Sequence, residues 1–325
     1  MTEINFLHNN SQDQTFLLLG FQGLYSYRFL VFAIFIIVYI LILCGNVLII
    51  LVIVSNRLQH SPMYFFLCNL SLLEIVSTTE IIPAILQILL RNGIRLSLFG
   101  CLAQLYFIGS FSTTESFLLT VMSYDRYLAI CRPLHYSSVM HFRFCCYFVL
   151  ASWISAFLIV FVVIGFLSQQ DFCRQINTID HFFCDFIPVL GLSCSDTSTV
   201  KMTIYLLSPL SIISPFLLIT MTYVFIIRSV LNIQSVTGKK KAFSTCSSHL
   251  TVVCIYYITL FMVYVVPTND RSLQANKILS LLYTVITPIL NPFIYSLNNR
   301  EIKTGINLSL NWKIKRKIKS QNNFG

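Results

Sequence analysis

An acid and a base stand side by side near the end of a long apolar stretch of this chain. The segment MSYDRYLAICRPLHY covers residues 122–136 and contains the pair Asp125 and Arg126. Charged residues inside a membrane-spanning stretch are costly and therefore mark a functional site by default. Asp125 can neutralise Arg126, and breaking that pair would free the guanidinium for another partner. The alternative is a permanent ion pair that only anchors the helix end.

The composition places these residues in a membrane. Hydrophobic residues make up 56% of the 325 residues and charged residues only 10%, which excludes an ordinary soluble domain. Five uncharged stretches, and two that contain acids, reach the roughly 20 residues needed to cross a hydrocarbon core. We predict an all-α membrane protein, a single domain over residues 1–325. Its expected spans are at about 28–55, 61–90, 96–130, 143–168, 199–228, 240–267 and 273–297.

The Lys and Arg residues set the expected orientation, because positive charge stays on the cytoplasmic side. With the N-terminus outside, fourteen of them fall on the inner side and seven on the outer side. We therefore expect an extracellular tail at 1–27 and a cytoplasmic tail at 298–325. The basic inner face favours contact with anionic lipid over binding of nucleic acid. Asn9-Asn10-Ser11 matches the acceptor pattern for N-glycosylation, with Asn9 as the acceptor on the outer tail.

The cysteines divide by the side on which they are expected to lie. Seven of the eleven fall in spans or at inner helix ends, where free thiols are the rule. Cys101, Cys173, Cys184 and Cys194 fall on the outer side, where four cysteines allow three pairings. The residues alone do not choose among these pairings. Nucleotide-binding, zinc-protease and nucleophile-elbow patterns are absent from the sequence, so we predict that the chain is not an enzyme.

Several blocks of the chain resemble those of one family, in order and in spacing. They are Gly45-Asn46, SPMYFFLCNLSLLE (61–74), MSYDRYLAICRPLHY, Trp153, KAFSTCSSHLTVV (241–253) and TPILNPFIYSLNNR (287–300). The chain resembles a rhodopsin-type G-protein-coupled receptor, and more narrowly a class II odorant (olfactory) receptor. The resemblance covers nearly the whole chain and departs from the family at Glu74, where Asp is usual. It implies a seven-transmembrane helix bundle with a short amphipathic C-terminal helix.

The resemblance also implies the parts that transmit a signal. A freed Arg126 would meet a heterotrimeric G protein of the olfactory stimulatory type, which raises cyclic AMP. The last span contains Pro292, which weakens the helix and provides a hinge. The residues implied in coupling and activation are Asp125, Arg126, Tyr127, Tyr223, Asn291, Pro292 and Tyr295.

A ligand pocket is implied in the outer halves of the third, fifth, sixth and seventh spans. The matching positions are apolar with a few hydroxyls and carry no charge, which suits a small, neutral, hydrophobic odorant. An amine ligand would need an acid where Ile108 stands. The implied lining residues are Ile108, Gly109, Ser112, Thr113, Leu207, Ser211, Tyr257, Ile258, Tyr264 and Thr284.

Two carboxylates complete the implied sites. The resembled fold brings Glu74 and Glu115 together in adjacent helices, where they must share a proton or bind a cation such as Na⁺. We expect no other cofactor and no metal. A small-solute transporter or channel is the rival function, and it would use this pair to move ions or protons. The absence of an internal repeat disfavours that rival.

The resemblance finally implies two disulfides and a location. The expected pairs are Cys101 with Cys184 and Cys173 with Cys194, which would fix the outer loop over the bundle. The chain is expected to be a multi-pass protein of the plasma membrane with an extracellular N-terminus. Its expected partners are the odorant, the G protein and membrane lipid.

Overall fold

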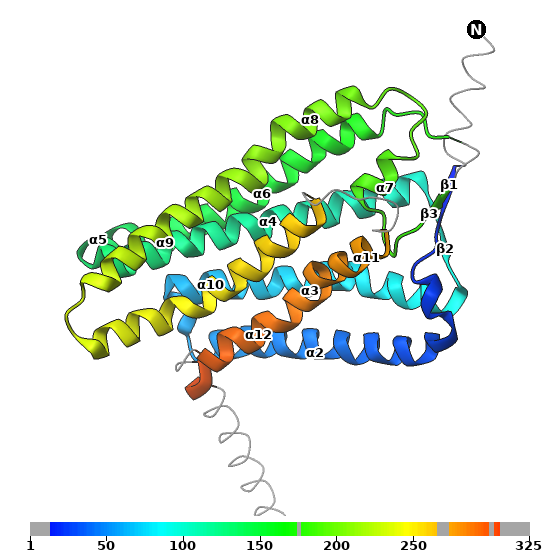
Figure 1. Ribbon diagram of the computed structural model, residues 1–325. Coiled ribbons are helices and arrows are strands. Elements are labelled where there is room, and N and C mark those ends of the chain that lie inside the picture. Colours follow the sequence, from blue (N-terminus) through cyan, green and yellow to red (C-terminus); the bar gives the residue numbers. More distant parts are fainter. Residues whose placement is uncertain (1–13, 174–176, 265–272, 299–301, 306–325) are drawn as a thin grey trace, which may run out of the picture.

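The computed structural model is a bundle of long helices that is closed at one end by a small sheet (Figure 1). It describes residues 14–173, 177–264, 273–298 and 302–305. The long helices are α2 (Arg28–Ser55), α3 (Pro62–Arg91), α4 (Leu98–Cys131), α6 (Phe142–Leu167), α8 (Ser198–Ser208), α9 (Ser214–Asn232), α10 (Val236–Tyr264), α11 (Leu273–Leu281) and α12 (Thr287–Asn298). The short helices are η1 (Gln22–Tyr27), η2 (Leu58–His60), α5 (Pro133–Val139) and α7 (Phe186–Leu190).

Two π-helical turns join pairs of these helices into single spans. η3 (Pro209–Ile213) connects α8 to α9, and η5 (Leu282–Ile286) connects α11 to α12. By length and composition, six spans among the described residues are apolar enough to cross a membrane. The seventh long helix, α4, has 34 residues and contacts α3, α6, α9 and α10. Because its neighbours surround it, α4 can bury hydroxyl side chains such as Ser110 and Thr114.

The fold is the predicted seven-helix bundle. Some helices continue past the predicted spans: α9 ends at Asn232 rather than at 228, and α10 begins at Val236 rather than at 240. A helix need not stop where the hydrocarbon layer stops, so hydropathy marks the span and not the helix end. The predicted C-terminal helix is represented by the helical residues 302–305, and the rest of it lies outside the described residues.

A three-stranded sheet covers one end of the bundle. Strand β1 (Thr15–Leu18) lies between β2 (Ile94–Ser97) and β3 (Thr178–Ile179), antiparallel to the first and parallel to the second. Residues 1–27 are therefore not the plain tail that the sequence predicts, because they contain β1. We call residues 14–20, 94–97 and 177–194 the lid, and the end of the bundle beneath it the lid end. The opposite end is named the Arg126 end.

Two disulfides strengthen the lid end. Cys101, in the first turn of α4, is joined to Cys184, and Cys173 is joined to Cys194. These are the two pairs that the family resemblance implies. The first bond ties the lid to the bundle, whereas the second closes a loop within the segment between α6 and α8. Both pairings match the separation of outer and inner cysteines made from the sequence.

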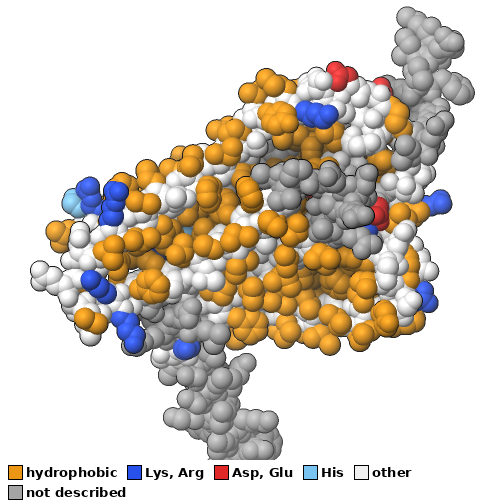
Figure 2. Space-filling view, viewed as in Figure 1, with side chains coloured by type: hydrophobic (Ala, Val, Ile, Leu, Met, Phe, Trp, Pro, Cys, Tyr) orange, Lys and Arg blue, Asp and Glu red, His pale blue; other side chains and the backbone are white. Residues whose placement is uncertain are grey.

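The surface agrees with a protein that spans a membrane. In Figure 2 hydrophobic side chains cover the middle of the bundle as a broad band. Many of the exposed apolar side chains come from helices on its perimeter, such as Phe29, Leu51, Phe161 and Leu217. Lys and Arg side chains are visible at both ends of this view, and the acids visible in it lie at the lid end. The chain is therefore a multi-pass membrane protein.

Candidate functional site

At the Arg126 end, one carboxylate holds two partners from different helices. Arg126 donates through Nε to Asp125 over 2.9 Å, and its Nη2 also pairs with the same carboxylate. The other oxygen of Asp125 accepts from the hydroxyl of Tyr136 on α5 at 2.8 Å. Burial and the Asp125 carboxylate raise the pKa of Tyr136, so the phenol keeps the proton that it donates. Asp125 is fully buried, and Arg126 is 9% exposed.

A histidine that the sequence analysis did not select links three helices beside this pair. His249 of α10 is buried; its Nδ1 lies 2.7 Å from the hydroxyl of Tyr223 on α9. Its Nε2 lies 3.1 Å from the carbonyl oxygen of Leu119 on α4. An ionisable residue in an otherwise apolar span is a functional candidate by rule, and that rule would have selected His249. Tyr223 is thereby placed at the contact of α4, α9 and α10.

The remaining residues implied in activation lie along α12 and α4. Pro292 packs against Gly45 of α2, where an added Cβ would be 3.1 Å from the proline ring. Tyr295 is 2% exposed, and its hydroxyl has no hydrogen-bond partner among the described residues. Tyr127 stacks on Tyr124, with 6.3 Å between the ring centroids. The close approach at Gly45 explains why α2 and α12 can lie in direct contact.

A polar cluster lies in the middle of the bundle. Asn291 donates its amide to the buried carboxylate of Glu74, and Glu115 is close enough to interact electrostatically with Glu74. Asn46 donates to the carbonyl oxygens of Ile42 and Pro288 at 3.1 and 3.4 Å. Within the described part of the chain, three oxygens here have no hydrogen-bond donor. They are Asn46 Oδ1, Glu115 Oε1 and Asn291 Oδ1.

Nearer the lid end, two adjacent tyrosines of α10 bind one face of α4. The Tyr256 hydroxyl donates to the carbonyl oxygen of Ser112 at 2.7 Å and lies 3.2 Å from its side-chain oxygen. The Tyr257 hydroxyl lies 2.8 Å from that of Ser116. Ser112 and Tyr257 were implied pocket residues, whereas Tyr256 was not selected. Hydroxyls on the two facing helices therefore satisfy one another where the pocket is expected to end.

Two other implied pocket residues lie on the π-helical turns. Ser211 is in η3 and Thr284 is in η5, and both are buried. Each hydroxyl donates to a carbonyl oxygen of its own helix, at 3.3 Å to Leu207 and 2.7 Å to Ser280. A π turn inserts an extra residue and so changes the direction of the side chains around it, often at functional sites. Sequence periodicity does not reveal such a turn.

The structure changes the predicted role of two residues, and it does not describe the side chains of two others. Ile258 is 61% exposed and lies on the outward face of α10, so the prediction that it lines the pocket is wrong. Successive helical residues differ by about 100°, and Tyr256 and Tyr257 already take the two inward directions. Gly109 faces α6, with Val160 3.2 Å from an added Cβ. The side chain of Tyr264 and residue Asn9 lie outside what the structure describes.

The other implied pocket residues lie on α4 and α8. Ile108 is buried in the hydrophobic cluster beneath the lid. The Thr113 hydroxyl donates to the carbonyl oxygen of Gly109 at 2.9 Å, and Leu207 is partly buried in α8. No residue of this pocket set carries a charge.

The lid contains two buried titratable groups. Burial and the nearby Lys277 ammonium lower the pKa of His181 to about 3, so its imidazole is neutral at pH 7. Burial raises the pKa of Asp185 to about 6, although this carboxylate accepts a hydrogen bond from the backbone of Phe186 at 2.7 Å. Among the described residues, no group of three or more His, Cys, Asp or Glu side chains could hold a metal ion.

The geometry defines a seven-helix membrane protein with a covered end, a polar core and an acid-base pair at the other end. Comparison with known proteins defines it further. The family model described as "Olfactory receptor" matches residues 35–313. Olfactory receptor 11L1 of Homo sapiens is 45% identical over 298 residues, which is 92% of this chain and 92% of that protein.

Other human relatives give the same result. Olfactory receptor 6F1 is 42% identical over 295 residues, 91% of this chain and 96% of that protein. Olfactory receptor 11A1 is 44% identical over 293 residues, 90% of this chain and 92% of that protein. The chain belongs to the olfactory receptor family. It is therefore an odorant receptor rather than an enzyme, its family implies G-protein coupling, and the transporter alternative has no support.

Proposed function

We propose that this receptor binds a small, neutral, hydrophobic odorant near the lid end and activates the olfactory stimulatory G protein, which raises cyclic AMP. The observation that carries the proposal is the chemistry of the implied pocket, which combines apolar side chains with hydroxyls and contains no charge. Burial provides the affinity for such a ligand, and one or two hydrogen bonds orient it. Ile108, which stands where an amine ligand would need an acid, is buried beneath the lid.

The proposed pocket keeps most of the residues that the resemblance implies. Ser112, Ser211, Tyr257 and Thr284 offer hydroxyls, but each already takes part in a hydrogen bond within the bundle. An odorant oxygen would therefore share or replace one of these bonds. Ile258 is excluded by its exposure, and Gly109 contributes space rather than contact.

At the Arg126 end, the proposed signal is the release of Arg126 from Asp125. The pair is buried, so release requires an acceptor on the G protein to replace the carboxylate. Tyr136 holds the second oxygen of Asp125, and Tyr223 with His249 binds α9 and α10 to α4. Because the two contacts of His249 join α10 to α9 and to α4, an outward shift of α10 would change both of them together. Odorant binding would shift an existing equilibrium between two such arrangements.

The proposed location is the plasma membrane, with the lid end and the N-terminus extracellular. The lid-end position of both disulfides supports this orientation, because disulfides persist in an oxidising space. The basic residues of the opposite end would then face the anionic cytoplasmic leaflet and the G protein. Asn9 would carry an N-linked glycan on the extracellular tail.

We further propose that the polar cluster around Glu74 binds Na⁺. The alternative is that Glu74 and Glu115 share one proton. Three oxygens of this cluster, on Asn46, Glu115 and Asn291, lack a donor among the described residues. A single proton would satisfy one pair of them, whereas a cation attracts several oxygens at once. Glu74 and Glu115 would supply the charge.

A cyclic AMP screen tests the proposed function. Cells that express the receptor with trafficking helpers would be exposed to a chemically diverse odorant panel, and Arg126→Ala at matched surface expression would serve as the control. Neutral, hydrophobic odorants should raise cyclic AMP in the wild type alone. A response restricted to amines would contradict the pocket proposal.

A further inference from the structure

A buried lysine joins the lid to the seventh span. Lys277 of α11 is 5% exposed, and its ammonium donates to the carbonyl oxygen of Gly20 at 2.8 Å and to Asp180 Oδ1 at 2.5 Å. A charge removed from water needs such partners, because an unpaired one is strongly unfavourable. Gly20 belongs to the N-terminal segment and Asp180 to the segment after β3. One side chain therefore joins α11 to two segments that are distant from it in the sequence.

The carbonyl of Gly20 is fixed in place by its surroundings. The backbone at Gly20 has φ +63°, and an added Cβ would lie 2.4 Å from the side chain of Ile88 on α3. The amides of Leu19 and Gly20 donate to the carbonyl oxygens of Ile179 and His181, both at 3.0 Å. Only glycine fits this left-handed, crowded position. The segment is thus pressed against α3 with its carbonyl directed to Lys277.

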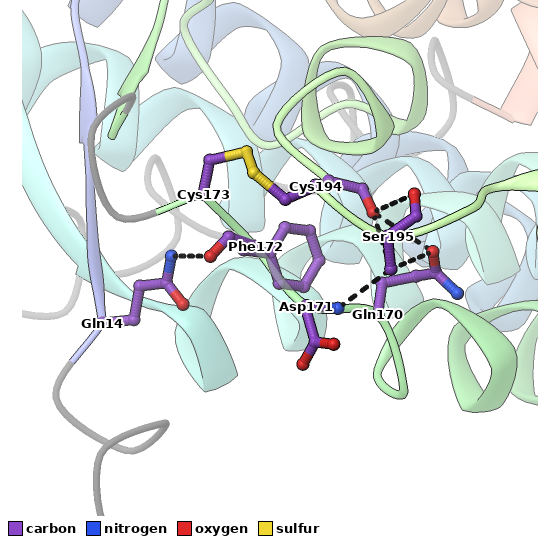
Figure 3. The surroundings of a disulfide bond; sticks show 8 residues. Gln14, Gln170, Asp171, Phe172, Cys173, Cys194 and Ser195 are labelled. Carbon is purple, nitrogen blue, oxygen red and sulfur yellow. Dashed lines mark hydrogen bonds between the residues drawn. A yellow bond between two sulfur atoms is a disulfide. The ribbon is translucent and has the colours of Figure 1, made fainter. Parts of the chain in front are cut away.

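The other end of β1 is held by the second disulfide loop. The side-chain amide of Gln14 donates to the carbonyl oxygen of Phe172 at 3.1 Å, next to the Cys173–Cys194 bond (Figure 3). Both disulfides fix the segment between α6 and α8, and neither includes a residue of β1. Hydrogen bonds and burial alone therefore hold β1. Lys277 provides the contact of this segment with the seventh span.

The surroundings of Lys277 set the strength of this interaction. His181, which is neutral at pH 7, adds no competing positive charge. Phe21 stacks on Phe182 with 5.2 Å between ring centroids, and His181 stacks on Phe182 at 4.6 Å. The Lys277 side chain is only 6% exposed, whereas the Asp180 side chain is 40% exposed. The ion pair is consequently weaker than a fully buried one, and the Gly20 carbonyl gives it direction.

We propose that Lys277 is a positioning residue for the lid, which holds the N-terminal strand and the β3 segment on the seventh span and thereby links lid position to that span. α11 continues through η5 into α12, so Thr284 and Asn291 lie on the same continuous span as Lys277. Since Arg126 is paired with Asp125 in this structure, the contact belongs to the arrangement with the Arg126 end closed. Loss of the contact should favour the other arrangement. The inference rests on receptor function but on no particular odorant.

The test compares three variants of the full-length receptor at matched surface expression. Lys277→Met removes the ammonium, Lys277→Arg keeps a cation, and Lys201→Met removes an exposed lysine of α8 as a control. Hydrogen exchange of residues 15–20 should become about tenfold faster in Lys277→Met, which corresponds to about 1.4 kcal/mol. It should recover in Lys277→Arg and stay unchanged in Lys201→Met. Basal cyclic AMP per surface receptor should rise in Lys277→Met alone.

A second variant covers the case in which Lys277→Met fails to fold. Gly20→Ala leaves the lysine intact but displaces the carbonyl, and it should accelerate exchange of residues 15–20 in the same way. If both variants fold, the double variant should show less than the sum of the two effects, because each breaks the same contact. Unchanged exchange in Lys277→Met would overturn the proposal. Faster exchange without a rise in basal cyclic AMP would overturn the link to the seventh span.

Discussion

The two ends of the bundle are held by different kinds of interaction. At the lid end, two disulfides, a three-stranded sheet and the Lys277 contacts fix the segments. At the Arg126 end, the described polar contacts of the side chains are hydrogen bonds and one ion pair, among them those of Arg126, Tyr136 and His249. Covalent and sheet contacts resist separation, whereas hydrogen bonds between side chains of different helices can exchange partners. The comparison indicates that the Arg126 end is the part built to rearrange.

The largest expected effect is at the end that should rearrange. Arg126→Ala should abolish the cyclic AMP response while surface delivery stays largely intact, because the residue is proposed to contact the G protein. Arg143→Ala, which removes an exposed arginine of α6, is the matched control and should respond normally. Cyclic AMP and surface expression would be measured in the same cells. A normal response in Arg126→Ala would contradict the coupling role.

At the fixed end, loss of either disulfide should reduce stability rather than change coupling. In the chain-entropy model, the Cys101–Cys184 bond closes a loop of sequence separation 83 and contributes about 4 to 5 kcal/mol, against about 3 kcal/mol for Cys173–Cys194 with separation 21. Cys101→Ser should therefore lower thermal stability and surface delivery more than Cys173→Ser. Equal losses, or a larger loss in Cys173→Ser, would show that loop length does not determine the difference.

Between the two ends, the polar cluster should respond to salt. If Na⁺ binds at Glu74 and Glu115, replacing it with choline should lower the melting temperature of the wild-type receptor, because a bound ion stabilises the folded state. Glu115→Gln should remove this dependence. The measurement is a thermal unfolding series at constant ionic strength. A melting temperature that is the same in both salts would favour the shared proton.

Acidification should change the stability of the lid through two groups, His181 and Asp185, whose effects have opposite signs. The lowered pKa of His181 contributes stability that is present above pH 6.5 and is lost as the pH falls toward 3. The raised pKa of Asp185 contributes stability that is present below pH 3.8 and is lost as the pH rises toward 6. Protection of the lid against hydrogen exchange should thus rise on acidification from pH 6.5 to 4 in His181→Asn and fall in Asp185→Asn. If the protection of the lid changed with pH in the same direction in both variants, this explanation would be ruled out.

The smallest effect is expected in the pocket. Tyr264→Phe should weaken the response to a polar odorant by about 0.5 to 1.5 kcal/mol, the net value of one hydrogen bond, and Tyr264→Ala should cost more. Ser112→Ala should act similarly if that hydroxyl is the partner. Dose-response curves for several odorants would show whether the shift depends on the ligand. An equal shift for every agonist and for basal activity would remove Tyr264 from the pocket.

Six of the spans were predictable because they satisfy a length and hydropathy rule, and the seventh, α4, because its long stretch contains few charges. The strand β1 could not be predicted, because a four-residue strand has no partner until the fold brings the β2 and β3 segments beside it. Ile258 was misassigned because a family position does not reveal how a helix is rotated. Ser211 and Thr284 lie on π turns that periodicity cannot detect. Contacts such as Lys277 with Gly20 join residues 257 positions apart and follow only from the fold.

Hydrogen exchange of the purified receptor, with and without an agonist from the odorant screen, compares the two ends most directly. Agonist should accelerate exchange at the Arg126 end, in residues 122–139 and 219–250. Protection in residues 177–194 should stay the same, because the two disulfides hold this segment. β1, which the Lys277 contact holds in the closed arrangement, should exchange faster. Faster exchange in residues 177–194, with residues 122–139 and 219–250 unchanged, would contradict a lid end fixed by disulfides and a mobile Arg126 end.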